Sequence, residues 1–415
     1  MDSRVDILHR IFTRIRTLGL ATATLVGAQT ARAEMPALQL VVTWPVEVGE
    51  GPDLPAAHSV WRDLIDGARE RIDLAHFYAS DTPGSRLEPI VRALEHAAAR
   101  GVSIRWIGEE KFYRTYPETL DRLAAVDGIE VRRLRTGEIL GGVLHTKIML
   151  VDGETACLGS QNFDWRSLEH IVELGVRIHD QPTVAVYDAV FEADWALAGG
   201  ATLDAVDDDW DVDLSGFPRQ VDHDGAPVAI QPVLGGPQCL PDASLHDLPA
   251  LVGAIEGARS TVRAQMLSYS PLTRDGRYWP DLDLALRAAA TRGVRVELLV
   301  SHWNTRAGEI EHLKSLQVLE NVEVRVATVP AWSEGFVPFG RVLHAKSLTV
   351  DGRWSWVGTS NWSPGYFDSG RHHGLVVDGA PFASEVEDVF DRVWNADWTT
   401  TVDPARDYPA PRIGE

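Results

Sequence analysis

Cysteine is scarce in this sequence, since Cys157 and Cys239 are the two present in 415 residues. At most one disulfide can form, which excludes a small scaffold held together by several disulfides. Cys157 lies in an apolar run typical of a buried strand, and we expect both cysteines to be core thiols, with a disulfide as the alternative. Lysine is equally scarce. Four of the 39 basic residues are lysines, so a lysine that recurs in a motif is informative.

Positive charge is in deficit as well. The chain has 60 acidic and 39 basic residues, a formal net charge of −21 at pH 7. Such a surface repels nucleic acids and anionic membranes at long range, which excludes binding along an extended duplex by phosphate neutralisation. An anionic substrate must therefore be held in a local basic cleft.

The sequence lacks an apolar run long enough for a membrane span near its start. Four arginines precede the run 18–28, which has 11 residues where a bilayer needs about 20. Ala31-Arg32-Ala33 is a small-x-small cleavage site, so residues 1–33 are predicted to be a signal peptide, with a retained anchor as the alternative. Because 1–33 contain five Arg and two Asp, cleavage would change the net charge from −21 to −24. We expect an exported protein, periplasmic or secreted.

The chain contains an internal duplication. Residues 64–69 recur as 254–259, and residues 99–102 recur as 291–294. In each copy a helix is predicted to end at a glycine, and an apolar, strand-like run follows. This alternation predicts an α/β protein with two halves related by a pseudo-two-fold axis. We expect each half to have a mostly parallel mixed sheet flanked by helices.

The duplication sets the expected boundaries. We expect an N-terminal half over 34–200, an acidic linker over 201–232, a C-terminal half over 233–403 and a surface tail over 404–415. The linker has six aspartates between positions 204 and 213. A calcium site is the alternative, but the regular spacing of a calcium loop is missing, which favours a solvated linker.

A chemical motif follows the first helical region. His145 and Lys147 are two residues apart in a predicted strand, so both side chains point to one face, about 7 Å apart. Asp152 ends that strand in a tight turn, where a turn-forming role and a catalytic role are both open. After a returning strand come Ser160 and Asn162, which share a face and can donate hydrogen bonds to phosphate oxygens.

The motif recurs in the second half, with every position shifted by 199 residues. The second copy consists of His344, Lys346, Asp351, Thr359 and Asn361. The chance expectation for a single His-x-Lys-x4-Asp/Glu is about 0.02 in this composition, so two matched copies are no accident. Two of the four lysines lie in these motifs, where a compact ammonium suits a phosphate oxygen.

This residue set fits phosphodiester chemistry. A phosphodiester repels nucleophiles, so catalysis must neutralise its oxygens, attack phosphorus and protonate the leaving alkoxide. Two lysines with the hydroxyl and amide side chains can neutralise the oxygens. Two histidines can perform the other two tasks, one as nucleophile through a phosphohistidine and one as general acid and base. No cluster with metal-ligand spacing occurs in the sequence, so we expect neither a metal nor another cofactor.

These motifs resemble the phospholipase D superfamily. The runs Asn162-Phe163-Asp164-Trp165 and Gly358-Thr359-Ser360-Asn361 are similar to the branch that contains the animal lysosomal phospholipase D-like 5′ exonucleases. The resemblance covers about residues 50–400. It implies a two-lobed sandwich of α/β halves with the active site at their interface.

The resemblance also implies an acidic residue that orients a catalytic histidine. Glu173 lies 28 residues after His145, whereas His372 stands at the same distance after His344. A carboxylate fixes the imidazole tautomer and raises its basicity. The sequence therefore favours His145, oriented by Glu173, as the nucleophile and His344 as the acid and base.

The substrate stays open between two classes. A phospholipase D-type enzyme that hydrolyses or transfers a phosphodiester of a phospholipid, with transient contact with a membrane surface, is the leading hypothesis. The alternative is a 5′ exonuclease on the end of a short single-stranded nucleic acid. Aromatic residues that fit either are Trp303, Trp332, Trp362 and Tyr366. A catalytically inactive envelope-binding protein would have degenerate motifs, and both copies are intact. A monomer and a homodimer both fit.

Overall fold

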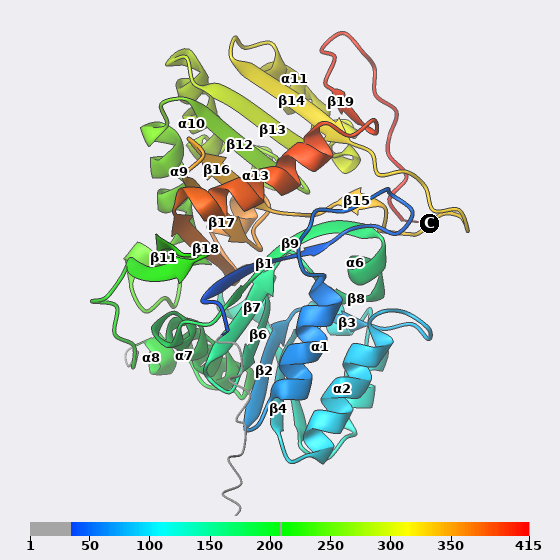
Figure 1. The fold of residues 1–415 in the computed structure, drawn as a ribbon, viewed down its shortest axis with the longest axis vertical. Helices are drawn as coiled ribbons and strands as arrows, with labels where there is room; N and C mark the ends of the chain where they lie inside the picture. Colours follow the sequence, from blue (N-terminus) through cyan, green and yellow to red (C-terminus); the bar gives the residue numbers. More distant parts are fainter. Residues whose placement is uncertain (1–34, 208–209, 415) are drawn as a thin grey trace, which may run out of the picture. The chain divides into compact units, whose positions relative to one another are not determined.

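The computed structural model describes residues 35–207 and 210–414. The expected signal peptide, 1–33, lies outside the described residues. The rest of the chain forms two lobes that follow one another along the sequence (Figure 1). No helix within the described residues is both long and apolar enough to span a bilayer.

The N-terminal lobe is built on a sheet with the strand order β1-β9-β7-β6-β2-β4-β5. Its strands are β1 (Leu38–Thr43), β2 (Arg71–His76), β4 (Ser103–Glu109), β5 (Ile129–Leu134), β6 (Lys147–Val151), β7 (Thr155–Gly159) and β9 (Ile171–Ile178), with the short pair β3 (Ala79–Ser80) and β8 (Phe163–Asp164) beside it. Its helices are α1 (Ala57–Gly67), α2 (Glu88–Ala99), α3 (Glu110–Tyr113), α4 (Glu118–Ala124), α5 (Thr136–Ile139), α6 (Trp165–Glu169) and α7 (Gln181–Ala198).

The C-terminal lobe repeats this plan, with the strand order β10-β11-β18-β17-β16-β12-β13-β14-β19. Its strands are β10 (Arg219–His223), β11 (Ala226–Gly235), β12 (Thr261–Met266), β13 (Arg295–Ser301), β14 (Val322–Ala327), β16 (Ser347–Val350), β17 (Trp354–Gly358), β18 (His372–Asp378) and β19 (Thr399–Thr401), and β15 (Val342–Leu343) joins the other lobe. Its helices are α9 (Asp247–Gly257), α10 (Asp281–Thr291), α11 (Ile310–Gln317), α12 (Pro364–Phe367) and α13 (Ala380–Trp394), with 3-10 turns at Ala243–Leu245 and His302–Thr305. The short helix α8 (Leu203–Asp207) packs against α7 of the N-terminal lobe.

Both sheets are mixed, which confirms the expected duplicated α/β class. Among the strands that each lobe supplies to its own sheet, parallel pairing occurs in one set of three neighbours, β2-β4-β5 in the first sheet and β12-β13-β14 in the second. The strands that carry the motifs, β6 and β7 or β16 and β17, form antiparallel hairpins. The expectation of a mostly parallel sheet thus holds only for these three strands of each sheet, which are connected through helices. The motif strands are antiparallel because the Asp-Gly turn after each motif reverses the chain directly.

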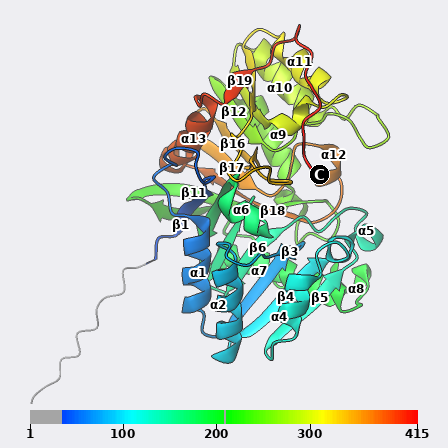
Figure 2. The ribbon, with the colours of Figure 1, turned by 90° about the vertical axis from the view of Figure 1, so that its right-hand side faces the viewer.

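The hydrophobic pattern of the helices explains the layers. In α1 the buried side chains Ala57, Val60, Trp61, Leu64 and Ile65 recur at the spacing of one helical face. This face and that of α2 pack on the first sheet, and α9 with α10 pack on the second. Figure 2 shows the two helix pairs in their separate lobes. Helices α7 and α13 contribute to a central core that includes residues of both sheets.

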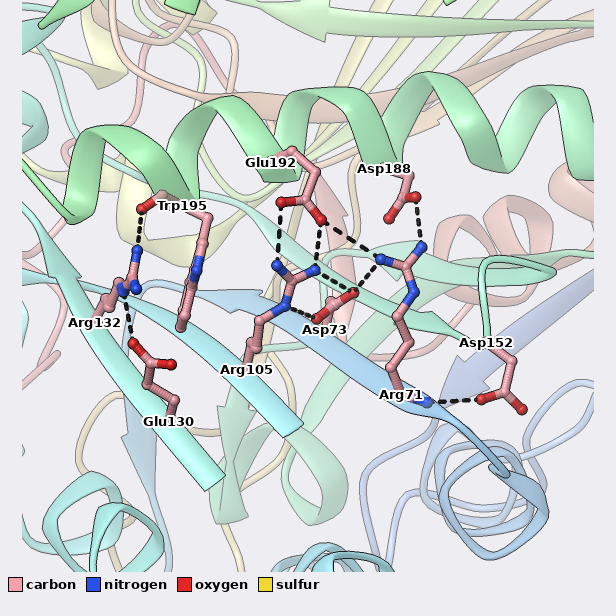
Figure 3. A network of polar contacts seen from close by, with 9 residues as sticks. All are labelled: Arg71, Asp73, Arg105, Glu130, Arg132, Asp152, Asp188, Glu192 and Trp195. Carbon is pink, nitrogen blue, oxygen red and sulfur yellow. Dashed lines mark hydrogen bonds and ion pairs between the residues drawn. The ribbon is translucent and has the colours of Figure 1, made fainter. Parts of the chain in front are cut away.

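A network of ion pairs fastens α7 to the first sheet. Arg105 on β4 donates to Asp73 on β2, with nitrogen–oxygen distances of 2.7 and 3.0 Å, and to Glu192 on α7 at 2.6 Å (Figure 3). Asp73 is fully buried, so this guanidinium compensates a carboxylate that has lost its water. At the opposite side of α7, the Tyr187 hydroxyl donates to the carbonyl of Gly374 in β18, at 2.7 Å. Helix α7 therefore joins the lobes.

The structure corrects one expected boundary. Most of the expected linker, 201–232, is folded: α8 lies at its start, and β10 and β11 extend the second sheet. The run of aspartates comes shortly before these strands, and its charge led to the prediction of a solvated linker over the whole segment. The tail, 404–415, has no helix or strand but is bonded to the lobe, because Lys314 donates to the Arg406 carbonyl and the Phe339 amide donates to the Ile413 carbonyl.

The segments before the two motifs cross between the lobes. Strand β15 pairs in parallel with β9 of the N-terminal lobe, Leu343 facing Val172. In the same way, Leu144 forms a bridge with Arg371 at the start of β18. Each motif therefore begins on the sheet of the opposite lobe, and this exchange determines which residues meet in the active site.

Candidate active site

The two motif histidines face a common cavity. The backbone amide of His145 donates to the Arg371 carbonyl at 3.0 Å, and that of His344 donates to the Val172 carbonyl at 2.9 Å. Both imidazoles line one cavity of about 930 Å³ between the lobes. The convergence expected from the duplication is therefore present, and it results from the strand exchange.

A carboxylate from the first lobe orients the histidine of the second. Nδ1 of His344 lies 2.7 Å from Oε2 of Glu173, and Ser167 donates to the other carboxylate oxygen at 2.6 Å. Glu173 is fully buried. Since Nδ1 carries the proton given to Glu173, Nε2 of His344 has its lone pair available. The expectation that Glu173 orients His145 is wrong, because β15 places the second histidine beside β9.

His145 has a neutral partner instead. Its Nδ1 lies 3.1 Å from the backbone carbonyl of Thr359, in the second lobe. The ring of His372 is 5.5 Å from that of His145, between centroids, and that of Tyr366 is 5.0 Å away. His372 thus occupies the place beside His145 that Glu173 occupies beside His344. The two halves of the site are unequal in charge.

Both motif lysines are buried next to their histidines. Nζ of Lys147 lies 3.2 Å from both nitrogens of the His145 ring and 2.9 Å from the His145 carbonyl. Nζ of Lys346 donates to the His344 carbonyl at 2.5 Å. These carbonyls hold the two ammoniums in place.

Burial disfavours every positive charge in the site. Burial lowers the pKa of Lys346 to about 7, although Glu173 opposes the shift. Burial and the charge of Lys346 lower the pKa of Lys147 well below its usual range. Burial lowers the pKa of His344 to about 4 against the effect of Glu173, and burial with the charge of Lys147 lowers the pKa of His145 well below its usual range. An anionic group placed among these residues relieves their repulsion, so the site is built to receive a negative charge.

The comparisons with known proteins agree with this chemistry. A family model described as "Cardiolipin synthase, PLD-like domain" matches residues 61–195 and 251–394. The chain is 34% identical over 370 residues to phospholipase D Z of Dictyostelium discoideum, covering 84% of this chain and 86% of the relative. The chain belongs to the phospholipase D superfamily. It is a phosphodiesterase of that superfamily.

Other relatives and a solved structure support the assignment. The mouse protein named 5'-3' exonuclease PLD4 is 32% identical over 387 residues, covering 86% of this chain and 76% of that protein. The crystal structure of phosphatidylserine synthase from Haemophilus influenzae superposes with a TM-score of 0.61 at 12% identity, covering 83% of this chain and 85% of that one. At this identity the superposition establishes the phospholipase D fold.

The motif aspartates of this superfamily member have a structural role, which corrects their assignment as catalytic. The Asp152 carboxylate accepts hydrogen bonds from the backbone amides of residues 69–71, at 2.8 to 3.3 Å. Asp351 does the same for residues 259–261, at 2.8 to 2.9 Å. Figure 3 shows the bond from the Arg71 amide to Asp152. Both aspartates lie at the end of their strand away from the histidine and fix the turn that leads into β2 or β12.

The motif hydroxyls also hold the fold instead of the substrate. Ser160 accepts from the Leu174 amide at 2.9 Å and donates to the Leu174 carbonyl at 3.1 Å. Thr359 accepts from the His373 amide at 3.1 Å. Both side chains are fully buried. Because these bonds connect β7 to β9 and β17 to β18, the expectation that Ser160 and Thr359 bind phosphate is corrected.

One motif asparagine faces the cavity, and the other has a structural contact. Asn162 lines the cavity, and its amide nitrogen is 3.4 Å from the Tyr78 hydroxyl. Asn361 is buried behind the cavity wall and hydrogen-bonds Tyr366, which does line the cavity. Asn162 can therefore reach a phosphodiester in the cavity, whereas Asn361 positions a tyrosine.

Several cavity residues were missed by the sequence interpretation. Arg166 is 8% exposed, lines the cavity and is held by Asp164 with an Nε–Oδ1 distance of 2.9 Å. Further basic side chains at the cavity are Lys111, Arg114, Arg135 and Arg274. Arg166 directly follows the run Asn162-Phe163-Asp164-Trp165 that resembles the exonuclease branch, which is a usable signal. Of the other four, Lys111 and Arg114 lie on α3 and at its end, and Arg135 and Arg274 lie far away in sequence, so no sequence pattern connects them.

The expected aromatic residues are only partly at the cavity. Trp303 and Tyr366 line it, together with Phe77, Tyr78, Phe112, Tyr116 and Phe339. Trp362 is fully buried and belongs to the core of the second lobe. Trp332 packs on the ring of His170, 4.8 Å between centroids. Cys157 and Cys239 are both buried, and burial raises the pKa of the Cys157 thiol to about 12.

Proposed function

We propose that this enzyme cleaves phospholipid phosphodiesters through a covalent phosphohistidine at His344, with His145 as general acid and base. The contact of Glu173 with Nδ1 of His344 carries the proposal, since it makes Nε2 of that ring the more basic nitrogen. This assignment reverses the one that the sequence favours. The argument is unchanged: the histidine with the carboxylate partner is the nucleophile.

The first step forms the intermediate. Nε2 of His344 attacks phosphorus, the nitrogen–phosphorus bond forms, and the bond from phosphorus to the leaving alcohol oxygen breaks. Nε2 of His145, protonated once the anionic substrate has raised its pKa, gives its proton to that oxygen. Glu173 stabilises the positive charge that develops on the His344 ring. Lys147 and Lys346 neutralise the non-bridging oxygens.

The second step regenerates the enzyme. Neutral His145 takes a proton from water or an alcohol, whose oxygen attacks phosphorus as the bond to His344 breaks. Water gives hydrolysis, and an alcohol gives transfer of the phosphatidyl group. All the residues in these steps belong to one chain, so we propose that a monomer is sufficient for activity.

A phospholipid substrate is supported by apolar groups at the cavity. Phe339 lines the cavity and is 47% exposed, and the nearby Phe336 is 40% exposed. Exposed aromatic rings of this kind insert into the interface of a bilayer. The acidic surface favours a zwitterionic lipid over an anionic one. Two Dictyostelium relatives are named phospholipase D Z and phospholipase D Y.

The end of a single-stranded nucleic acid is the second candidate. The Tyr78 ring stacks on Phe112 and on Tyr116, with centroids 6.1 and 4.8 Å apart, and such rings can stack on bases. Lys111 and Arg114 lie beside them at the cavity and can contact further phosphates. Relatives named 5'-3' exonuclease PLD4 are similar to this chain as well.

A paired-substrate assay separates the candidates. The purified enzyme is incubated with phosphatidylcholine vesicles in ethanol-containing buffer, and separately with a 5′-hydroxyl, 3′-labelled single-stranded oligonucleotide. We expect choline release and phosphatidylethanol, both lost in His344→Ala. Mononucleotide release without choline release rejects the lipid proposal, whereas turnover of neither by wild-type enzyme rejects both.

We also propose that the enzyme acts outside the cytoplasm. The composition of residues 1–33 supports export with cleavage after Ala33. Expression of the full chain in a bacterial host, followed by osmotic release and N-terminal sequencing, should give a sequence that starts at Glu34. An uncleaved chain in the cytoplasm would contradict this proposal.

A further inference from the structure

A second cavity lies apart from the active site. It has a volume of about 650 Å³ and shares no lining residue with the first. Its walls come from β1, the β10-β11 hairpin and α13, which lie near one another in Figure 1. The charged residues that line it are His223, Asp53, Asp224, Glu385, Asp388, Asp391 and Arg392. This cavity is acidic, in contrast to the basic active site.

Three of these side chains present their donor atoms to one another. Nε2 of His223 lies 2.8 Å from Oε1 of Glu385. With Asp224 they form a group in which one ligand atom from each residue lies within 4.8 Å of the others. An imidazole with two carboxylates is a typical donor set for Zn²⁺, whereas Ca²⁺ and Mg²⁺ prefer oxygen alone.

The imidazole is held as a metal ligand usually is. His223 is 4% exposed, and its ring packs edge-on against Phe382 with centroids 5.4 Å apart. The backbone of Leu38 in β1 also hydrogen-bonds the ring. Because Nε2 faces Glu385, this second partner fixes the orientation of the ring and leaves Nε2 for an ion.

The other two ligands are on rigid elements. Asp224 and Gly225 form the two-residue turn between β10 and β11, with φ angles of 53° and 78°, the geometry that such hairpins require. Glu385 is on α13, which packs against the central core. The donor atoms are thus brought together by the fold and need little rearrangement.

We propose that His223, Asp224 and Glu385 form a structural Zn²⁺ site that fastens the β10-β11 hairpin to α13. Tetrahedral zinc, with bonds of about 2.0 to 2.2 Å, places its ligand atoms about 3.4 Å apart. The atoms here reach that spacing through side-chain rotation, with water as the fourth ligand. The remaining carboxylates of the cavity add negative potential around the ion.

The sequence does not indicate this site, and the expectation of no metal was based on ligand spacing. His223 and Asp224 are adjacent, but Glu385 is 162 residues after His223. The simple alternative is an ion pair between a protonated His223 and Glu385, which needs no metal. Titration with zinc distinguishes the two.

Isothermal titration calorimetry of chelator-treated mature protein with ZnCl₂ tests the proposal. We expect one zinc ion at the site with a micromolar or lower Kd. Asp388→Asn, which changes a cavity carboxylate outside the donor set, should still bind one zinc ion, with at most a small loss of affinity. His223→Gln and Glu385→Gln should each fail to bind this zinc ion or bind it at least about tenfold more weakly. CaCl₂ and MgCl₂ should give no heat at the same concentrations.

Two controls keep the outcome unambiguous. The active-site histidines can also attract zinc, so His344→Ala is titrated in parallel. This variant should still bind the zinc ion that His223→Gln fails to bind. Crystals soaked in zinc should show an anomalous peak between His223 and Glu385, which does not depend on the stability of a variant. Absence of binding in wild-type protein, equal binding in His223→Gln, or a peak elsewhere only, overturns the proposal and leaves the ion pair.

Discussion

At the scale of single residues, the two halves of the active site differ in one group. Glu173 gives His344 a buried anionic partner, and His372 stands beside His145 in the corresponding place. A duplicated chain thereby assigns different roles to two residues with the same local sequence. The asymmetry lies outside the motifs, in the strands that follow them.

Glu173→Gln tests the importance of the charge. The amide keeps the size of the side chain but cannot stabilise the cationic ring that forms when Nε2 of His344 bonds phosphorus. We expect kcat to fall by about 100- to 10,000-fold with little change in KM. His372→Gln, at the matching position beside His145, should have a smaller effect. Equal losses in the two variants would argue against the asymmetric roles.

The pKa values predict an acidic optimum. His344 attacks in its neutral form, so activity rises as pH increases through its pKa of about 4. Lys346 acts as a cation, so activity falls as pH increases through its pKa of about 7. The general acid His145 must be protonated, and burial lowers its pKa as well, so it adds to the alkaline decline. The profile of kcat/KM, which reports groups of the free enzyme, should therefore be a bell with an acidic optimum. In Lys346→Arg, the alkaline limb should lose the part that Lys346 contributes, and an unchanged limb would exclude Lys346 as one of its sources.

At the scale of secondary-structure elements, each motif hairpin has a catalytic end and a structural end. His145 lines the cavity with Lys147 buried next to it, whereas Asp152 fixes the turn between α1 and β2 through backbone amides. The same division holds for β16 and β17. One sequence motif therefore serves chemistry and folding at opposite ends of a strand.

Asp152→Ala separates these two roles. The change leaves three backbone amides without their acceptor and places alanine at a φ of 54°. We expect the free energy of unfolding to decrease by about 1 to 3 kcal/mol, with kcat at a permissive temperature within about fivefold of wild type. Asp152→Asn keeps an acceptor and tolerates this φ, so it should be milder. A loss of kcat by orders of magnitude in a stably folded variant would restore a catalytic role.

The sequence predicted the repeat, the helix ends and the motif strands because these depend on local pattern. Helices α2 and α10 do end before Gly101 and Gly293, whose φ angles are 93° and 90°. The partner of Glu173 could not be predicted in the same way. It depends on the pairing of β15 with β9, a contact between segments about 170 residues apart that no periodicity encodes. The basic residues of the cavity were missed for the same reason.

At the scale of the whole molecule, the lobes share one core and one catalytic centre. Arg371, fully buried, extends from the second lobe to Asp194 on α7, with nitrogen–oxygen distances of 2.8 to 3.1 Å. Its own carbonyl accepts from the backbone of His145. The same residue thus connects the lobes and anchors a catalytic histidine.

Arg371→Met tests this connection. Removal of the guanidinium leaves the Asp194 carboxylate buried without a partner, at a cost of about 3 to 5 kcal/mol. The double variant Arg371→Met with Asp194→Leu removes both charges and should recover most of that stability. Chemical unfolding of the two variants gives the comparison. An equally unstable double variant would show that the arginine stabilises the lobes by other contacts.

The nucleophile itself is identified most directly by trapping the covalent intermediate. Enzyme mixed with substrate labelled at the phosphate is quenched in base, digested and mapped. We predict label on His344 in wild-type enzyme, more of it in His145→Ala because the second step lacks its base, and none in His344→Ala. Label on His145, or label that persists in His344→Ala, would contradict the assignment of His344, oriented by Glu173, as the nucleophile.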